Sequence, residues 1–369
     1  MSNLKFIISG GGTGGHIFPA ISIANALKKR VPSAEFLFVG AEGRMEMEKV
    51  PAAGYTIKGL PVFGFDRKNM FKNIKVLFCL VKSLFMAKRI VKEFKPNAVV
   101  GVGGYASGPT LYAANKLGIP TVLQEQNSYA GVTNKLLAKK AAKICVAYEG
   151  MEKFFPKETI LLTGNPVRQD FLEVPAKAEE AYKFFNFSPE KRTLLIIGGS
   201  LGARTVNKSV LLGLQKLKDA GIQVLWQTGK YYFEDMKKES AAFASDSLLV
   251  TDFVKRMDYA YSIADLVISR AGASSISELC LLGKPSVLVP SPNVAEDHQT
   301  KNAMALANRN AAVMISDAEA PEKMVDAALS LIADDGRLSE ISKNALAMAQ
   351  LNSADRIASE ILALIGYKE

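Results

Sequence analysis

Short runs of consecutive apolar residues recur along the chain, and each is followed by glycine or by polar residues. In the first half these runs predict strands over 4–9, 35–39, 98–101, 121–124 and 143–147. Apolar positions at helical spacing between them predict helices over 15–29, 74–94, 109–117 and 132–141. Short unbroken apolar strands that alternate with helices are typical of a parallel sheet covered on both faces.

The second half repeats this alternation. Strands are predicted over 193–197, 223–228, 248–251, 266–269, 286–288 and 312–315, with helices over 205–219 and 275–282 and a final helix over about 353–365. The sequence therefore predicts an α/β protein with two doubly wound, Rossmann-like domains, 1–165 and 166–349. We expect a cleft between them, with ligands at the carboxyl ends of the strands.

A glycine-rich turn follows the first predicted strand of each half, at 10–15 and at 198–203, and a third follows another strand at 101–109. Each turn leads into a helix. Its backbone amides can approach an anion, and the helix N-terminus favours negative charge. The two turns of the first domain are expected to open at the same sheet edge, where they could enclose a diphosphate.

The charge of the 369-residue chain is +10, but it is unevenly distributed. Residues 1–165 carry +13 and the remainder carries −3, which indicates an anionic partner for the first half. Nucleic acid is not favoured, because no nucleic-acid-binding motif accompanies the basic residues. The three cysteines are far apart and there are two histidines, which argues against a metal centre. Without a signal peptide or a long apolar segment, a cytoplasmic protein is expected.

Candidate chemistry begins at His16, directly after the first glycine turn. A histidine on the first helical turn faces the same space as the loop, and the helix dipole favours its neutral, basic form. The alternative is that His16 caps the turn or binds phosphate. The glycine spacing also fits a dinucleotide site, but Glu42 is a poor candidate for the acid that would bind the ribose. Glu125 and Asn127, which follow another strand, could orient a sugar hydroxyl or serve the loop structurally.

Two polar segments of the second half carry further candidates. Ser275 to Glu278 has the spacing of a helix capping box, yet Glu278 could instead accept hydrogen bonds from both ribose hydroxyls of a nucleotide. The segment 291–299 ends in His298 and Gln299, which could bind a sugar or could simply accompany helix initiation at Asp297.

Aromatic and aliphatic residues alternate with Lys and Arg over 63–95. An apolar helix face bordered by basic residues can lie in an anionic membrane surface. The same pattern fits the core face of an ordinary amphipathic helix, and the two interpretations stay open for the helix. The segment 63–71 favours a surface loop that dips into lipid.

Six motifs in this order resemble one family over essentially the whole chain: the peptidoglycan N-acetylglucosaminyltransferases that convert lipid I to lipid II (the MurG family). They are Gly11-Gly12-Thr13-Gly14-Gly15-His16-x-x-Pro19, the loop 101–109, Gln124-Glu125-x-Asn127, Gly164-Asn165-Pro166-Val167-Arg168, the loop 198–203 and the segment 270–278.

The resemblance implies a GT-B fold, in which the C-terminal helix, about 350–369, returns to the first domain. The donor would be UDP-N-acetylglucosamine and the acceptor undecaprenyl-diphosphate-linked N-acetylmuramyl-pentapeptide. The implied donor contacts are Thr13, Gly14, Gly15, Asn127, Arg168, Ser200, Val254, Ala273, Ser274, Ser275, Ile276, Ser277, Glu278 and Gln299. The acceptor diphosphate would lie on the glycine loops of the first domain, at Gly11, Gly12, Gly103, Gly104 and Tyr105.

The implied reaction is an inverting single displacement at the cytoplasmic face of the bacterial inner membrane. His16 is the first candidate for the base that deprotonates the acceptor, and Glu125 is the second. No tightly bound metal or cofactor is expected. Other cell-wall synthesis proteins are possible partners, in a pathway that serves cell shape and division. A UDP-sugar epimerase of related two-domain fold is the alternative function. A nicotinamide dehydrogenase and a non-enzymatic membrane adaptor are the other classes considered.

Overall fold

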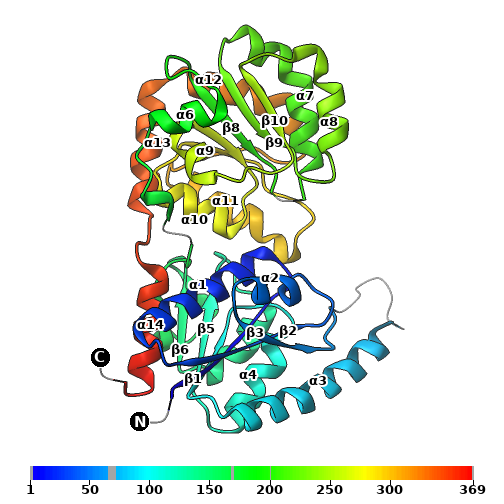
Figure 1. Ribbon diagram of the computed structural model, residues 1–369, viewed down its shortest axis with the longest axis vertical. Helices are drawn as coiled ribbons and strands as arrows, with labels where there is room; N and C mark the ends of the chain where they lie inside the picture. The colour runs from blue at the N-terminus through cyan, green and yellow to red at the C-terminus, as the bar shows by residue number, and fades with distance from the viewer. Residues whose placement is uncertain (1–2, 65–71, 168–169, 200, 368–369) are drawn as a thin grey trace. The chain divides into compact units, whose positions relative to one another are not determined.

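The computed structural model describes residues 3–64, 72–167, 170–199 and 201–367. The chain divides into two units (Figure 1). Unit 1 comprises 1–167 with 350–369, and unit 2 comprises 168–349. The division follows Val167, two residues after the predicted boundary. Each unit is built on one parallel sheet with helices on both faces, which confirms the predicted fold class.

The seven-stranded sheet of unit 1 has the order β3-β2-β1-β4-β5-β6-β7. The strand order reverses at β1, because β2 pairs with one of its edges and β4 with the other. Ligands of doubly wound folds bind at such a reversal, beyond the carboxyl ends of the strands. The strands are β1 Lys5–Ser9, β2 Glu35–Ala41, β3 Thr56–Leu60, β4 Ala98–Gly101, β5 Thr121–Glu125, β6 Lys143–Val146 and β7 Ile160–Leu162.

Alternate residues of β1 enter the two separate cores of unit 1. Phe6 and Ile8 pack with α1 (Gly14–Arg30), α2 (Glu46–Ala52) and α14 (Ser353–Leu364). Ile7 faces the other core, which is covered by α3 (Lys72–Phe94), α4 (Ser107–Lys116) and α5 (Val132–Leu137). The C-terminal helix α14 thus belongs to unit 1, where Ile357 and Ile361 are fully buried.

Unit 2 has a six-stranded sheet of order β10-β9-β8-β11-β12-β13, which reverses at β8. One face is covered by α7, α12 and α13, and α7 and α12 approach closely. A Cβ atom placed at Gly213 of α7 would lie 2.5 Å from a methyl carbon of Val325. The strands are β8 Thr193–Ile197, β9 Gln223–Gln227, β10 Leu248–Thr251, β11 Leu266–Ser269, β12 Ser286–Leu288 and β13 Val313–Met314. The helices are α6 Glu179–Phe185, α7 Arg204–Asp219, α8 Phe233–Glu239, α9 Met257–Ile263, α10 Ala273–Leu281, α11 His298–Ala307, α12 Ala320–Ile332 and α13 Asp335–Ala347.

A buried carboxylate, Asp265, joins the amino ends of β8 and β11. It accepts the Thr193 amide at 2.8 Å and lies 2.8 Å from Lys177 Nζ and 3.0 Å from Arg192 Nη1. Burial alone would raise the pKa of Asp265, but these hydrogen bonds and positive charges hold that pKa below its ordinary value.

Asp265→Asn is expected to lower the free energy of unfolding of unit 2 at neutral pH by about 1.5–3 kcal/mol, the usual size for hydrogen bonds to a charged group. Because the pKa of Asp265 is lower in the folded than in the unfolded state, its ionised form stabilises the fold at pH values above the unfolded pKa of roughly 4. This contribution is lost as the pH falls through the folded-state pKa. Urea unfolding at pH 7 and at pH 3 measures this. An equal difference between wild type and variant at both pH values would contradict it.

Candidate active site

The first glycine loop lies between β1 and α1, at the strand-order reversal of unit 1. Gly11 and Gly12 have φ angles of +150° and +88°, which residues with side chains rarely adopt. The helix begins at Gly14, after Thr13 as its N-cap. The sequence folds in this way because the glycines allow the sharp reversal from a buried strand into the helix.

His16 bends back onto this loop. Its Nδ1 lies 2.9 Å from the carbonyl oxygen of Gly11. Because a carbonyl only accepts hydrogen bonds, Nδ1 carries the proton, and the neutral ring then has Nε2 as its proton acceptor. This tautomer is suited to a general base whose reactive nitrogen is Nε2.

The second glycine loop of unit 1 contacts the first. A Cβ atom placed at Gly104 would lie 2.5 Å from the Gly11 carbonyl oxygen, and one at Gly103 would lie 2.9 Å from His16 Nε2. The Oγ of Ser107 lies 2.8 Å from the carbonyl oxygens of both Ser9 and Gly103. The two loops therefore open at the same sheet edge, as predicted. Tyr105, the residue after Gly104, has an exposed side chain.

One amide of the predicted diphosphate site already has a partner. The Gly12 amide donates to Glu46 Oε2 at 2.9 Å. An acceptor diphosphate would therefore have to use other amides of the two loops while Glu46 keeps this position. The glycine spacing pointed to Glu42, which follows the same strand, and gave no signal for Glu46.

Glu125 is buried at the carboxyl end of β5, and both of its oxygens accept hydrogen bonds. Oε1 accepts the Asn127 amide at 3.1 Å, and Oε2 accepts the Gly131 amide and Asn134 Nδ2, both at 2.9 Å. These bonds hold the loop that carries Asn127. They favour the structural interpretation of Glu125, which is the weaker candidate for the base.

The glycine loop of unit 2 is closed by its own backbone and by the loop after β9. The Gly202 amide donates to the Gly199 carbonyl at 3.1 Å, and a Cβ atom placed at Gly229 would lie 2.1 Å from the Gly202 nitrogen. Helix α7 begins directly afterwards, at Arg204. Two predicted donor contacts, Arg168 and Ser200, lie outside the described residues.

The capping-box interpretation of Glu278 is wrong. The N-cap of α10 is Gly272 and the helix begins at Ala273, so Ser275 lies inside the helix. Glu278 Oε2 instead accepts from the hydroxyl of Tyr261 at 2.9 Å. Tyr261 is buried, and this burial with the neighbouring Glu278 carboxylate raises the pKa of its hydroxyl well above the ordinary value. Tyr261 therefore remains a hydrogen-bond donor that orients Glu278.

The remaining predicted donor contacts lie in the loop at Val254 and on helices α10 and α11. The Val254 amide donates to Gln227 Oε1, and the Ser291 amide donates to Gln299 Oε1, both at 2.9 Å. Ala273, Ser274, Ser275, Ile276 and Ser277 form the first turns of α10.

Arg270 has a structural explanation that sequence reasoning lacked. Its guanidinium donates to the Val289 carbonyl at 3.0 Å and pairs with Asp317 at 2.5 Å, and both side chains are largely buried. Asp317 also accepts from the hydroxyl of Thr205 at 2.8 Å, on the first turn of α7. This network joins the carboxyl ends of β11 and β12 to α7, the helix that follows the glycine loop of unit 2.

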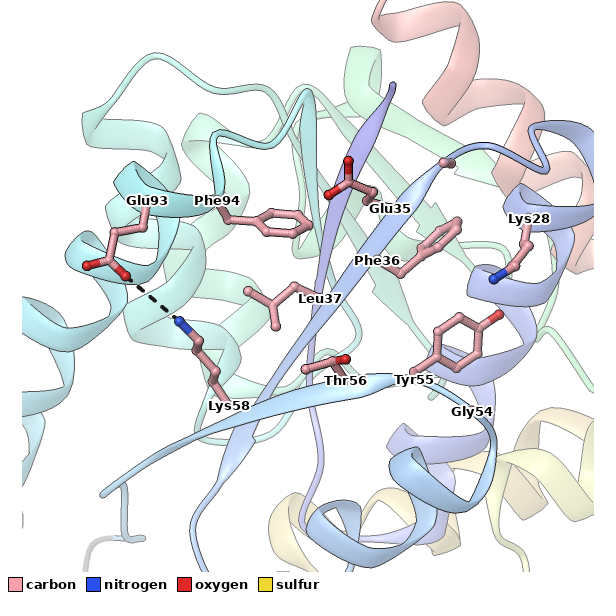
Figure 2. Close-up of a pocket in the computed structure, with 11 residues that line it drawn as sticks. Lys28, Glu35, Phe36, Leu37, Gly54, Tyr55, Thr56, Lys58, Glu93 and Phe94 are labelled. Carbon is pink, nitrogen blue, oxygen red and sulfur yellow. Dashed lines mark ion pairs between the residues drawn. The ribbon is translucent and has the colours of Figure 1, made fainter. Parts of the chain in front are cut away.

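A separate hollow of about 520 Å³ lies at the amino ends of β2 and β3 (Figure 2). Phe36, Tyr55 and Phe94 line it, and Lys58 pairs with Glu93 at 3.8 Å across it. Because the strands are parallel, this hollow and the glycine loops lie at opposite ends of the sheet. It is therefore no part of the candidate site.

Within the described ranges, no three His, Cys, Asp or Glu side chains gather in a group that could hold a metal ion. None of the helices described is long and apolar enough to cross a membrane.

Known proteins resemble the chain over its full length. The glycosyltransferase family 28 N-terminal domain matches residues 6–146, and the C-terminal domain of the same family matches 193–361. A "UDP-N-acetylglucosamine--N-acetylmuramyl-(pentapeptide) pyrophosphoryl-undecaprenol N-acetylglucosamine transferase" from Parabacteroides distasonis is 63% identical over 100% of both chains. The protein of the same name from Porphyromonas gingivalis is 56% identical over 100% of this chain and 97% of its own.

Solved structures agree with these sequences. The crystal structure of Acinetobacter baumannii MurG is 28% identical, covers 98% of this chain and 99% of its own, and has a TM-score of 0.79. A putative UDP-N-acetylglucosamine 2-epimerase from Listeria monocytogenes covers 100% of this chain and 99% of its own with a TM-score of 0.70, but at 11% identity it shows the fold alone. The chain therefore belongs to glycosyltransferase family 28, and within it to the MurG family of N-acetylglucosaminyltransferases.

Proposed function

We propose that this protein transfers N-acetylglucosamine from UDP-N-acetylglucosamine to the 4-hydroxyl of N-acetylmuramic acid in undecaprenyl-diphosphate-linked N-acetylmuramyl-pentapeptide, converting lipid I to lipid II. The observation that carries the proposal is the 63% identity to a transferase of this name over the whole of both chains. The epimerase alternative is supported only by distant similarity of fold.

The proposed mechanism is a single displacement with inversion at the anomeric carbon. Nε2 of His16 takes the proton of the attacking hydroxyl, while Nδ1 donates to Gly11. The charge that develops on the leaving diphosphate is stabilised by the loop 198–203, Arg168 and the N-terminus of α10. Glu278, oriented by Tyr261, accepts from the ribose hydroxyls. No tightly bound cofactor takes part.

Incubation with labelled UDP-N-acetylglucosamine and a short-chain lipid I analogue tests the proposal. Labelled disaccharide-lipid with stoichiometric UDP, formed only when the muramyl acceptor is present, is expected. UDP release without disaccharide would favour an epimerase or a hydrolase. A protein that binds no UDP-N-acetylglucosamine would contradict the whole proposal.

The first unit is proposed to bind an anionic membrane surface, at the cytoplasmic face of the inner membrane, through α3 (Figure 1). Helix α3 has two apolar faces. One is buried, with Ala87 and Val91 in the core, and the opposite face leaves large apolar side chains exposed. Their spacing of three to four residues places them in one stripe. The stripe comprises Ile74, Leu77, Phe78, Val81 and Phe85.

Basic residues border this stripe and supply the attraction to anionic lipid. Lys75, Lys82 and Arg89 follow one another at intervals of seven residues, so they line one flank of the helix. All three are exposed, although Arg89 also pairs with Glu93 at 2.6 Å. The exposure of the stripe excludes the core interpretation for these positions. The segment 63–71 was predicted to dip into lipid, and most of it, residues 65–71, lies outside the described residues.

The double variant Phe78→Ser and Phe85→Ser is expected to weaken partitioning into phosphatidylglycerol-containing vesicles by about tenfold or more for each residue, from the loss of its apolar burial. Vesicle co-sedimentation at low and high salt measures this, and wild-type binding should weaken with salt. Leu212→Ser is the matched control, because Leu212 is equally exposed on α7 of unit 2. Equal binding by the double variant and wild type would contradict the proposal.

A further inference from the structure

A buried carboxylate beneath the first glycine loop has no part in the proposed reaction. Glu46, the first residue of α2, is 0% exposed. Its Oε2 accepts the Gly12 amide and its Oε1 accepts the Ala41 amide, both at 2.9 Å. Burying a carboxylate is costly unless it is hydrogen-bonded, so these two bonds fix the position of the side chain and of the amides.

The surrounding backbone is shaped to admit this side chain. A Cβ atom placed at Gly11 would lie 2.1 Å from Glu46 Oε1, and one placed at Gly40 would lie 2.6 Å from Glu46 Cγ. Two glycines, in the loop after β1 and near the end of β2, therefore leave the space that Glu46 fills. Any side chain at either position would displace the carboxylate or the loop.

The fixed backbone of this loop in turn determines the position of His16. Gly11 and Gly12 are conformationally free residues, and a loop of such residues needs a contact that selects one conformation. Glu46 supplies that contact at the Gly12 amide, and the preceding carbonyl, that of Gly11, accepts from His16 Nδ1 at 2.9 Å.

We propose that Glu46 is a positioning residue, which clamps the first glycine loop so that the Gly11 carbonyl orients His16 and fixes its proton on Nδ1. The effect on catalysis rests on the proposed function, in which His16 is the base. The effect on the tautomer is a property of the folded chain and can be measured without turnover.

Nitrogen-15 NMR of labelled histidine tests the tautomer directly. The chain has two histidines, so a His298→Asn variant assigns both signals. Wild type is expected to hold His16 with its proton on Nδ1. Glu46→Gln keeps the shape of the side chain but offers one acceptor oxygen instead of two, so one amide loses its partner. His16 in this variant is expected to show a mixture of the two tautomers.

A double-mutant cycle tests the catalytic consequence. Glu46→Gln is expected to lower kcat at least tenfold in the wild-type background. In the His16→Ala background it is expected to lower kcat less than twofold, because Glu46 affects catalysis through His16. The affinity for UDP, measured by calorimetry, is expected to change less than twofold. Glu48→Gln is the matched control, since Glu48 is exposed on the same helix.

An unchanged His16 tautomer in Glu46→Gln would overturn the proposal, and so would an equal loss of kcat in both backgrounds. Glu46→Asp, which is too short to reach both amides, provides the same measurements if the glutamine variant is not recovered folded. Absence of transfer by wild type itself would instead contradict the proposed function and leave the tautomer measurement to decide the role of Glu46.

Discussion

Replacing His16 by alanine is expected to lower kcat for transfer to a lipid I analogue by about 100-fold or more, since general base catalysis typically contributes ~10²-fold or more. The imidazole lies on the first turn of α1, where the helix dipole favours the neutral ring. Its Nδ1 is committed to the Gly11 carbonyl. Steady-state kinetics with both substrates varied measures the effect, which should fall on kcat rather than on the KM for UDP-N-acetylglucosamine.

His16→Asn separates the base from the loop contact. The Asn amide nitrogen can still donate to the Gly11 carbonyl, but the side chain has no basic nitrogen. This variant should keep the stability of wild type and lose as much kcat as His16→Ala. A loss of less than tenfold in either variant would remove His16 as the base, and Glu125, despite its four hydrogen bonds, would be the next residue to substitute.

Every strand that is fully buried was predicted from its apolar run, and so were β10 and β13 at the edges of the sheet of unit 2. Each predicted strand is present, including the short β12 and β13. The two strands that were not predicted, β3 and β7, are the edges of the sheet of unit 1. In β3, Thr56 and Lys58 are exposed, so the apolar run is interrupted. A pattern that relies on unbroken apolar runs therefore misses β3, whereas β7 is an apolar run of only three residues, Ile160–Leu162.

The glycine loops of the candidate site were predictable, but the contacts that hold them were not. A glycine turn can be recognised from the sequence because its residues are consecutive. The partner of Gly12 is Glu46 and the partner of Glu278 is Tyr261, each from a different element. Spacing along the chain placed Glu42 after β2 and suggested a cap for Glu278. Only the fold shows that Glu46, four residues after Glu42, is buried and that α10 begins before Ser275.

Glu278→Ala is expected to raise the KM for UDP-N-acetylglucosamine about tenfold or more, because hydrogen bonds to a charged group contribute roughly 1.5–3 kcal/mol. The side chain leaves α10 about one and a half turns from the helix N-terminus that is proposed to meet the diphosphate. The variant also deprives the buried Tyr261 hydroxyl of its acceptor. We therefore expect a measurable loss of thermal stability as well, of about 1–3 kcal/mol.

Two neighbouring variants separate these effects. Tyr261→Phe removes the hydroxyl together with its need for a partner, so stability should change little, and the donor KM should rise less than in Glu278→Ala because only the orientation of Glu278 is lost. Glu278→Gln keeps an acceptor oxygen for Tyr261 and removes the charge, so it should melt like wild type and bind donor more weakly. If Glu278→Ala loses stability but binds the donor normally in calorimetry, the carboxylate serves only Tyr261, and recognition of the ribose must be assigned to other residues of unit 2.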